Sequence, residues 1–406
     1  MVTEVMTDRL SIRFCGLKFQ SPFVLAASPC TDELEMVQNA FRAGWAGAVL
    51  KTTHTESIVY RPVSPLLWGN DFEDKKVVGL GNIDVRSKYH VGIVEERVHR
   101  LKQEFPDKIV IASVGGNNRE TAQQATERLV RAGVDAIECA PGGCPQDVDY
   151  LHKSHGRSSA SEEDPYRMMV TWVKQAAGKV PLIIKVEGEA VADALKAQEA
   201  GADAVVVGGG RTAVMGVDLD TFVPYPSVAG KSTYAGYTGP IIKPLTLGLL
   251  CKVRQAVQLP LAASGGAMTW LDALEFICLG ATTVQFATAV MRNGFRIIDD
   301  LMEGVETYLE EKEISSASNL VGKALPNLVT QNELSQEYQL VSSVNRDACI
   351  KCDLCYIACR DGGHMAIELG EDRIPKVDEK KCVGCGLCRC VCPVWDCITL
   401  KPNEAI

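Results

Sequence analysis

The feature that most constrains this 406-residue chain is a spacing of four cysteines that occurs twice near its C-terminal end. Each copy reads C-x2-C-x2-C-x3-C, and Pro393 follows the second copy. Proteins that hold two [4Fe–4S] clusters use this spacing, and the fourth thiolate of each run ligates the other cluster. We therefore assign one cluster to Cys349, Cys352, Cys355 and Cys392, and the other to Cys382, Cys385, Cys388 and Cys359.

A pair of zinc knuckles is the alternative for these thiols. Two C-x2-C pairs suffice for a structural zinc ion, so zinc would leave a third thiolate of each run without a role. One departure from the iron–sulfur pattern is Arg360, which follows Cys359 where a proline is usual. This departure removes no ligand. Because such clusters pass single electrons, the rest of the chain should supply or consume them.

The composition narrows the class of protein and its compartment. The formal net charge of −9 argues against a nucleic-acid partner, which would need a basic surface. No apolar run reaches the roughly 18 residues of a membrane span, and residues 1–12 lack the apolar core of a signal peptide. Eight of the sixteen cysteines stand at cluster spacing, so we expect a reducing, cytoplasmic location.

Between about residues 23 and 296, short apolar runs alternate with segments of helical periodicity. Eight strands separated by helices predict a (β/α)8 TIM barrel. An open doubly wound sheet is the alternative, although no G-x-G-x-x-G follows the first strand. We expect strands at 23–28, 47–52, 109–114, 136–139, 182–186, 204–207, 261–263 and 283–287, and helices at 32–43, 120–132, 165–177, 190–200, 245–257, 270–279 and 295–309.

This pattern predicts an α/β protein in two parts: a barrel at residues 1–314 and a ferredoxin-like domain with two [4Fe–4S] clusters at 347–406, joined by a connector at 315–346. Barrel chemistry lies at the C-terminal ends of the strands. Three connections there, residues 53–89, 140–164 and 208–243, are longer than plain loops. We expect them to form lids and substrate walls.

Two motifs at the expected strand ends point to a flavin phosphate and ring. Gly265 and Gly266 end the seventh strand and open a helix, where free N–H groups favour a phosphate, and Thr288 after the eighth strand adds a hydroxyl. A tight turn is the alternative reading of the glycines. Lys51 and Lys185 each end an apolar strand, and an ammonium there would stabilise negative charge on a reduced flavin ring. The alternative for either lysine is a solvated strand end.

A third motif is Cys144-Pro145, in the long loop after the fourth strand. A thiol above a flavin can carry a proton while hydride moves to or from the flavin. Cys144 is the candidate, with His152, His155 and Ser161 as possible further proton carriers. Cys139, inside the strand, should instead be a buried apolar residue.

These residues resemble those of the catalytic subunit of bacterial NAD-dependent dihydropyrimidine dehydrogenases, and the barrel resembles class 1 dihydroorotate dehydrogenases. The resemblance implies FMN contacts at Ser28, Lys51, Thr52, Lys185, Gly239, Gly265, Gly266, Ala287 and Thr288. It also implies that Cys144 transfers the proton and that Asn82 contacts the substrate. Two [4Fe–4S] clusters would relay electrons to an NAD(P)H-oxidising FAD/iron–sulfur subunit, in a hetero-oligomer without a nucleic-acid or membrane partner.

The chain departs from this family at two places. The family reads N-x-S-C-P before its catalytic cysteine, whereas residues 140–145 read APGGCP, and the family's Asn-Thr after strand six falls at Gly209-Gly210. Both changes remove amide groups that grip a pyrimidine ring. The expected reaction is oxidation or reduction of a C–C bond beside a carbonyl, as between uracil or thymine and the 5,6-dihydro form. The alternatives are a non-pyrimidine ring or enone, an anionic substrate facing Arg157, Arg211 or Lys231, and an electron-transfer subunit without its own substrate.

Overall fold

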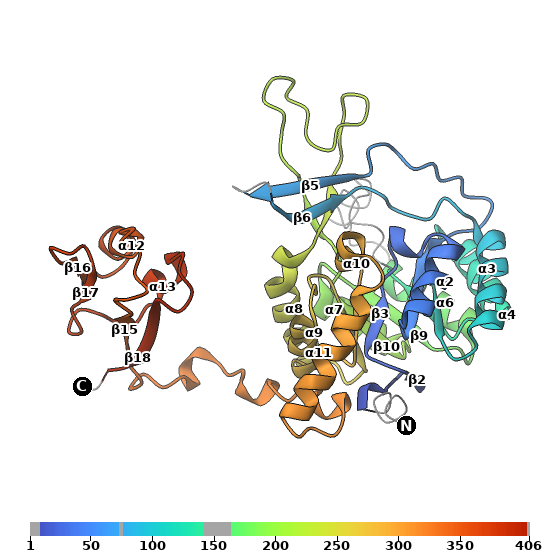
Figure 1. Ribbon diagram of the computed structural model, residues 1–406. Helices are drawn as coiled ribbons and strands as arrows, with labels where there is room; N and C mark the ends of the chain where they lie inside the picture. The colour runs from blue at the N-terminus through green and yellow to red at the C-terminus, as the bar shows by residue number, and fades with distance from the viewer. Residues whose placement is uncertain (1–8, 73–75, 142–163, 404–406) are drawn as a thin grey trace. The chain divides into compact units, whose positions relative to one another are not determined.

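The computed structural model describes residues 9–72, 76–141 and 164–403. The chain divides into two compact units, Met1–Pro326 and Asn327–Ile406. Figure 1 labels the elements of each unit, which are described separately below. None of the described helices is both long and apolar enough to cross a membrane.

The first unit is built on a closed barrel of eight parallel strands, which confirms the predicted architecture. The strands are short and almost entirely buried, as expected of parallel strands covered on both faces. Each expected run forms one of them, and consecutive strands along the chain are neighbours in the barrel. The strands are β3 (Phe23–Leu25), β4 (Gly47–Thr53), β7 (Ile109–Val114), β8 (Ala136–Cys139), β9 (Leu182–Val186), β10 (Ala204–Val207), β13 (Leu261–Ser264) and β14 (Thr283–Phe286).

Helices surround the barrel (Figure 1). Their ends follow local rules: α4 begins at a capping box of Asn118 and Thr121 and ends at Gly133, whose φ of +95° suits glycine. The seven expected helices match observed helices to within two residues at each end, and α3 and α10 were not among them. The helices are α2 (Leu34–Ala43), α3 (Val91–Glu104), α4 (Arg119–Ala132), α6 (Pro165–Ala177), α7 (Ala190–Glu199), α8 (Lys243–Ala256), α9 (Trp270–Cys278), α10 (Thr288–Asn293) and α11 (Ile297–Glu311).

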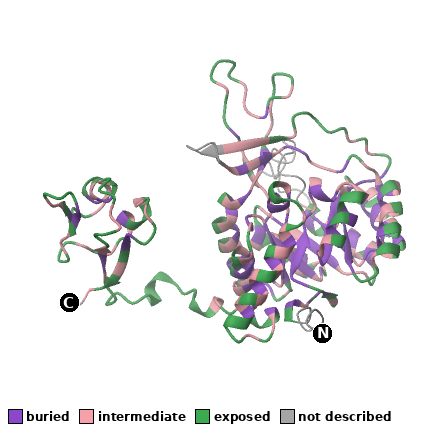
Figure 2. Ribbon diagram, viewed as in Figure 1, coloured by how far each residue is buried: buried purple, intermediate pink, exposed green. Residues whose placement is uncertain are grey.

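Apolar side chains fill two layers, one between the strands and helices and one inside the barrel. Figure 2 shows the buried residues concentrated in the barrel strands. The interior layer includes Val49, Ile183 and Val206. An antiparallel hairpin of β1 (Ile12–Phe14) and β2 (Leu17–Phe19) packs against this layer through Phe14 and Phe19. The hairpin thus lies at the N-terminal ends of the barrel strands.

Two of the long connections pair with each other to form a four-stranded sheet of order β11-β12-β6-β5. Its strands are β5 (Leu67–Phe72), β6 (Lys76–Asn82), β11 (Arg211–Ala213) and β12 (Ala235–Thr238). A small core of Ile83, Met215 and Ala235 supports it, and Trp68 stacks on Tyr225 at 4.1 Å between ring centroids. These connections were expected to form substrate walls, and in the structure they form a hydrogen-bonded sheet.

The second unit consists of two small antiparallel sheets and two short helices. The β15 strand (Leu340–Val344) pairs with β18 (Ile398–Pro402), and β16 (Ile367–Leu369) pairs with β17 (Pro375–Val377). The helix α12 (Leu354–Gly362) carries Cys355 and Cys359 of the first run, and α13 (Leu387–Val391) carries Cys388 of the second. Helix α12 continues through Arg360, whose side chain donates to Asp361 at 2.7 Å, so the missing proline leaves the helix intact.

Candidate functional site

A cavity of about 250 Å³ opens at the C-terminal ends of the barrel strands. Residues at or just after the end of each of the eight strands line it, together with residues of β6 and β12. Among the residues expected from the sequence, the cavity brings together Ser28, Thr52, Asn82, Lys185, Gly265, Gly266, Ala287 and Thr288. Gly239 and Lys51 are not among its lining residues.

Gly265 and Gly266 adopt positive φ angles of +103° and +105°, which disfavour any side chain. A Cβ at Gly265 would lie 2.6 Å from the carbonyl oxygen of Gly209, and one at Gly266 would lie 2.5 Å from Cα of Lys243. The turn is therefore closely packed on its outer side. Its main chain lines the cavity beside Thr288, which begins α10.

Gly239 supports this region from outside the cavity. Its φ is +104°, and a Cβ there would approach Cα of Gly79 in β6 to 3.2 Å. The preceding residue, Thr238, accepts a hydrogen bond from the Thr288 hydroxyl at 3.1 Å. Gly239 thus holds β12 against β6 and positions a residue that contacts the expected phosphate-binding threonine.

Lys185 is one of two basic residues among the described residues that line the cavity, the other being Arg86. The side chain of Lys185 is 12% exposed and its Nζ lies 3.8 Å from Oε1 of Glu138, which is 1% exposed. Gln285 donates from Nε2 to the other carboxylate oxygen at 2.7 Å, and its own Oε1 finds no partner among the described residues. Sequence reasoning missed Glu138 and Gln285, although a charged or amide residue within a short buried strand was a visible signal.

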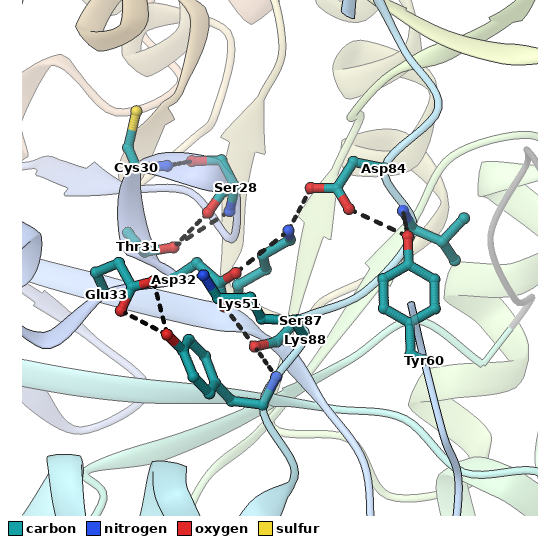
Figure 3. A network of polar contacts seen from close by, with 12 residues as sticks. Ser28, Cys30, Thr31, Asp32, Glu33, Lys51, Tyr60, Asp84, Ser87 and Lys88 are labelled. Carbon is teal, nitrogen blue, oxygen red and sulfur yellow. Dashed lines mark hydrogen bonds and ion pairs between the residues drawn. The ribbon is translucent and has the colours of Figure 1, made fainter. Parts of the chain in front are cut away.

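Lys51 has a different environment from Lys185. Its Nζ forms ion pairs with Asp84 and, at 3.5 Å, with Asp32, and its side chain is 9% exposed (Figure 3). Tyr60 donates to the second oxygen of Asp84 at 3.1 Å, and burial raises the pKa of this tyrosine. Asp84 itself lines the cavity. Lys51 is therefore paired with Asp84, which lines the cavity, and does not line the cavity itself. The neighbouring Thr52 does line the cavity, and its hydroxyl hydrogen-bonds to Ser113 at 2.8 Å.

Asn82 ends β6 and lines the cavity from the four-stranded sheet. Its Oδ1 accepts the main-chain N–H of Asp84 at 2.8 Å, which fixes the turn that carries Asp84. Across the cavity, Ser28 follows β3 and its hydroxyl accepts the N–H of Cys30 at 3.3 Å. Both expected contact residues are therefore held in place by local hydrogen bonds.

Glu187 is a cavity residue that sequence reasoning missed. It follows β9 and its pKa is raised by burial, an effect that the charges of Lys185 and Arg211 partly oppose. Arg211 does not line the cavity and donates from Nη1 to the main-chain oxygen of Glu187 at 3.0 Å. Lys231 lies in an exposed turn, so neither Arg211 nor Lys231 faces the cavity as the alternative of an anionic substrate would require.

The candidate proton carrier Cys144 lies outside the described residues, as do His152, His155, Arg157 and Ser161. Cys139 is 2% exposed, and burial raises its pKa to about 12, so it is an inert thiol as expected.

The cysteines of the second unit surround two separate pockets. One pocket is lined by Cys349, Cys352, Cys355 and Cys392 together with Cys397, which belongs to neither run, and the other by Cys359, Cys382, Cys385 and Cys388. Each pocket thus takes three thiols from one run and the fourth from the other, as the spacing predicts. Among the described residues, no group of three or more His, Cys, Asp or Glu side chains is arranged to hold a single metal ion.

Comparisons with known proteins agree with this division. A family model described as dihydroorotate dehydrogenase matches residues 144–309, and a 4Fe-4S dicluster domain matches residues 342–400. The chain is 35% identical over 403 residues to the NAD-dependent dihydropyrimidine dehydrogenase subunit PreA of Escherichia coli (strain K12), covering 98% of this chain and 96% of that protein.

Two further relatives are more distant. The chain is 28% identical over 343 residues to the chloroplastic dihydropyrimidine dehydrogenase (NADP(+)) of Arabidopsis thaliana, covering 80% of this chain and 79% of the plant protein. A solved structure of DHODH in complex with ferulenol from Eimeria tenella matches with a TM-score of 0.61 over 78% of this chain and 88% of that one. At 18% identity this likeness concerns the fold alone.

The barrel carries a cavity at its strand ends, and the second unit carries two thiol-lined pockets within the region that the dicluster model matches. The chain therefore belongs to the dihydropyrimidine dehydrogenase family of oxidoreductases, with a dihydroorotate dehydrogenase-like barrel followed by a 4Fe–4S dicluster domain.

Proposed function

We propose that the chain is an FMN-dependent oxidoreductase that reduces or oxidises a C–C bond next to a carbonyl in a small cyclic substrate. Electrons would pass through two [4Fe–4S] clusters to or from a separate NAD(P)H-oxidising flavoprotein subunit. The observation that carries the proposal is the cavity that joins a positive-φ diglycine turn, Thr288 and Lys185 at the ends of the barrel strands.

The residues of the cavity fit FMN in two respects. Gly265 and Gly266 carry no side chain and line the same cavity as Thr288, which suits a phosphate. Gln285 carries a buried Oε1 without a described partner and lines the same cavity, so a ligand donor would satisfy it. Ser28, Thr52 and Ala287 are the further candidate contacts, while Lys51 and Gly239 would act from outside the lining.

Bound FMN would supply the two-electron chemistry. Lys185 would place a positive charge beside the ring, and Glu138 and Gln285 hold that lysine in position. Cys144 would give or take the substrate proton, a role that rests on its sequence context. Asn82 would contact the substrate from β6.

The two pockets, each lined by three thiols of one run and one of the other, support an electron relay with one [4Fe–4S] cluster in each. The relative from Escherichia coli is named a subunit of an NAD-dependent enzyme, which supports a hetero-oligomer with a nicotinamide-oxidising partner. A cytoplasmic location accords with oxygen- and oxidant-sensitive clusters.

Anaerobic purification tests this proposal. The chain should retain FMN and iron, and chemically reduced protein should transfer hydride to a member of a panel containing uracil, thymine, orotate and unsaturated carbonyl compounds. A protein that retains neither flavin nor iron, or that reduces none of the panel, contradicts the proposal.

Substrates other than pyrimidines remain the second candidate because Gly209 and Gly210 offer no side-chain amide to the cavity. Relative rates on the same panel separate a pyrimidine from an enone or another ring. A Cys144→Ala variant separates both from a pure electron-transfer subunit, because turnover unchanged with FMN intact would favour the latter.

A further inference from the structure

The carboxyl group of Glu187, on the cavity wall, occupies the space that a side chain at Gly209 would fill. Glu187 immediately follows β9 and is half-buried. A Cβ built on Gly209 would overlap its Oε1 and lie 2.8 Å from its Cδ. The φ of Gly209 is outside the left-handed region, so glycine is needed there for space and not for backbone conformation.

The carboxyl oxygens of Glu187 have no hydrogen-bond or ion-pair partner among the residues that the structure describes. This distinguishes Glu187 from Glu138, whose two oxygens face Gln285 and Lys185. Arg211 binds the main-chain oxygen of Glu187 and not its carboxyl group. A half-buried carboxyl group on a cavity wall that has no partner among the described residues is available to a ligand.

We propose that Glu187 is a specificity-determining residue that binds the N–H and C=O edge of a cyclic amide or imide in the barrel cavity. This inference rests on the proposed function and names the substrate class for it. A protonated carboxyl group donates one hydrogen bond and accepts another, which matches adjacent ring C=O and N–H groups. A hydrogen-bonding site of this kind discriminates strongly against analogues that lack the matching group.

The electrostatics of the site agree with a protonated carboxyl group. Burial raises the pKa of Glu187, and Glu138 adds to that effect while Lys185 and Arg211 oppose it. The other charged residues that line the cavity are Asp84 and Arg86, after β6. The described lining therefore holds three carboxyl groups, Asp84, Glu138 and Glu187, against two cations, Lys185 and Arg86, so it has no excess of positive charge to favour an anionic ring.

The test compares binding to the FMN-loaded full-length chain by calorimetry. The probes are uracil and hydantoin, which carry the N–H and C=O edge, 1,3-dimethyluracil, which lacks N–H groups, and orotate, which adds a carboxylate. Wild-type protein should bind uracil or hydantoin more tightly than the other two. Glu187→Ala should weaken that binding roughly ten- to hundredfold, the effect of losing a paired hydrogen-bonding group, and leave the affinity for 1,3-dimethyluracil unchanged.

Three variants serve as controls. Glu187→Gln keeps one donor and one acceptor and should bind uracil or hydantoin within about threefold of wild type. Gly209→Ala keeps Glu187 but displaces its carboxyl group, and should reproduce the loss seen in Glu187→Ala. Glu189→Ala alters an exposed carboxylate two residues away that makes no side-chain cap and should have no effect.

Binding that is equal in wild type and Glu187→Ala at equal FMN content overturns the inference, as does a wild-type protein that binds neither uracil nor hydantoin. Reduction of an enone without an N–H group, such as 2-cyclohexen-1-one, would then still support the proposed function. Absence of FMN from the wild-type protein would instead count against the proposed function itself.

Discussion

At the scale of single residues, the cavity is shaped as much by missing side chains as by those present. Gly266 has a φ of +105° and faces the main chain of Lys243, while Gly209 leaves the space that the Glu187 carboxyl group occupies. Among the charged residues, Lys185 faces the cavity and Lys51 faces Asp84. Each of these placements makes a separate prediction.

Gly266→Ala should lower FMN affinity at least roughly tenfold. An alanine at positive φ stores strain of about 1–3 kcal/mol, and its Cβ would lie 2.5 Å from Cα of Lys243, so the turn must shift. Fluorescence titration of the flavin-free protein measures the affinity. Gly248→Ala is the matched control, because a Cβ at that helical position meets nothing within 4 Å. Equal affinities for the two variants would remove the diglycine turn from the flavin site.

Lys185→Gln should slow hydride transfer roughly tenfold, which corresponds to ~1.4 kcal/mol in the barrier. The substitution removes the positive charge beside the cavity and leaves Glu138 without its cation. Stopped-flow single-turnover reduction, normalised to FMN content, measures the step. Lys179→Gln changes an exposed lysine and serves as the control. Equal single-turnover rates would show that Lys185 has only a structural role.

Glu187→Gln should make the free energy of unfolding less dependent on pH above about 4.5, the ordinary pKa of the group. The folded-state pKa of Glu187 is raised above its ordinary value of 4.5, so the native state holds a proton that the unfolded state releases. Its contribution to stability is therefore lost as pH rises from about 4.5 through the raised pKa. Urea unfolding across this range should show wild type losing stability relative to the variant as pH rises. A pH-independent difference would mean that the carboxyl group titrates normally.

At the scale of elements, the four-stranded sheet links two distant connections above the barrel. Tyr237 in β12 pairs with Gly81 in β6, and its hydroxyl donates to Asn70 in β5 at 2.8 Å. A Cβ on Gly79 would lie 2.6 Å from Cζ of Tyr237, so the ring packs directly on a bare stretch of β6. The same strand ends at Asn82, which lines the cavity.

Gly79→Ala should therefore raise the KM for substrate several-fold while leaving FMN content unchanged. The added methyl group must displace the Tyr237 ring or β6, and a displacement of β6 moves Asn82. Steady-state kinetics with a dye as electron acceptor, together with the flavin absorbance of the purified protein, separate the two effects. Gly69→Ala in β5 is the control, because its Cβ would make an ordinary 3.4 Å contact with Val77. A Gly79→Ala variant with wild-type KM would mean that the sheet does not position the substrate.

At the scale of the whole molecule, the chain divides its chemistry between two units: a barrel with one large cavity and a domain with two thiol pockets. This division predicts that a mutation can abolish electron transfer through the second unit without abolishing the reaction of the substrate in the barrel. The thiols make the test possible, since Cys390 is exposed and lines neither pocket.

Cys352→Ala should lose about half of the iron and abolish electron transfer to the nicotinamide-oxidising partner, because one cluster lacks a ligand. Reduction of the FMN by substrate in a single turnover should persist, since the barrel is a separate compact unit. Iron analysis and stopped-flow absorbance measure the two outcomes. Cys390→Ala should keep wild-type iron content, and a loss of iron in that variant would contradict the ligand assignment.

The sequence by itself determined the barrel and the cluster spacing, because both depend on local patterns. Parallel strands covered on both faces are continuous apolar runs, and three ligands of each cluster come from one short segment. Helix α3 was less visible, since its buried positions from Val91 to Leu101 are separated by charged residues.

Tertiary structure decided how similar residues differ in role. Lys51 and Lys185 both end apolar strands. Asp84, from a later segment of the chain, forms an ion pair with Lys51, whereas Lys185 lies near Glu138 instead. The four-stranded sheet depends on pairing between residues about 150 positions apart, which no local pattern encodes. The Glu187 carboxyl group has room because Gly209, which follows the next strand of the barrel, has no side chain. Contacts between distant segments, and the space that one segment leaves for another, arise only when the chain has folded.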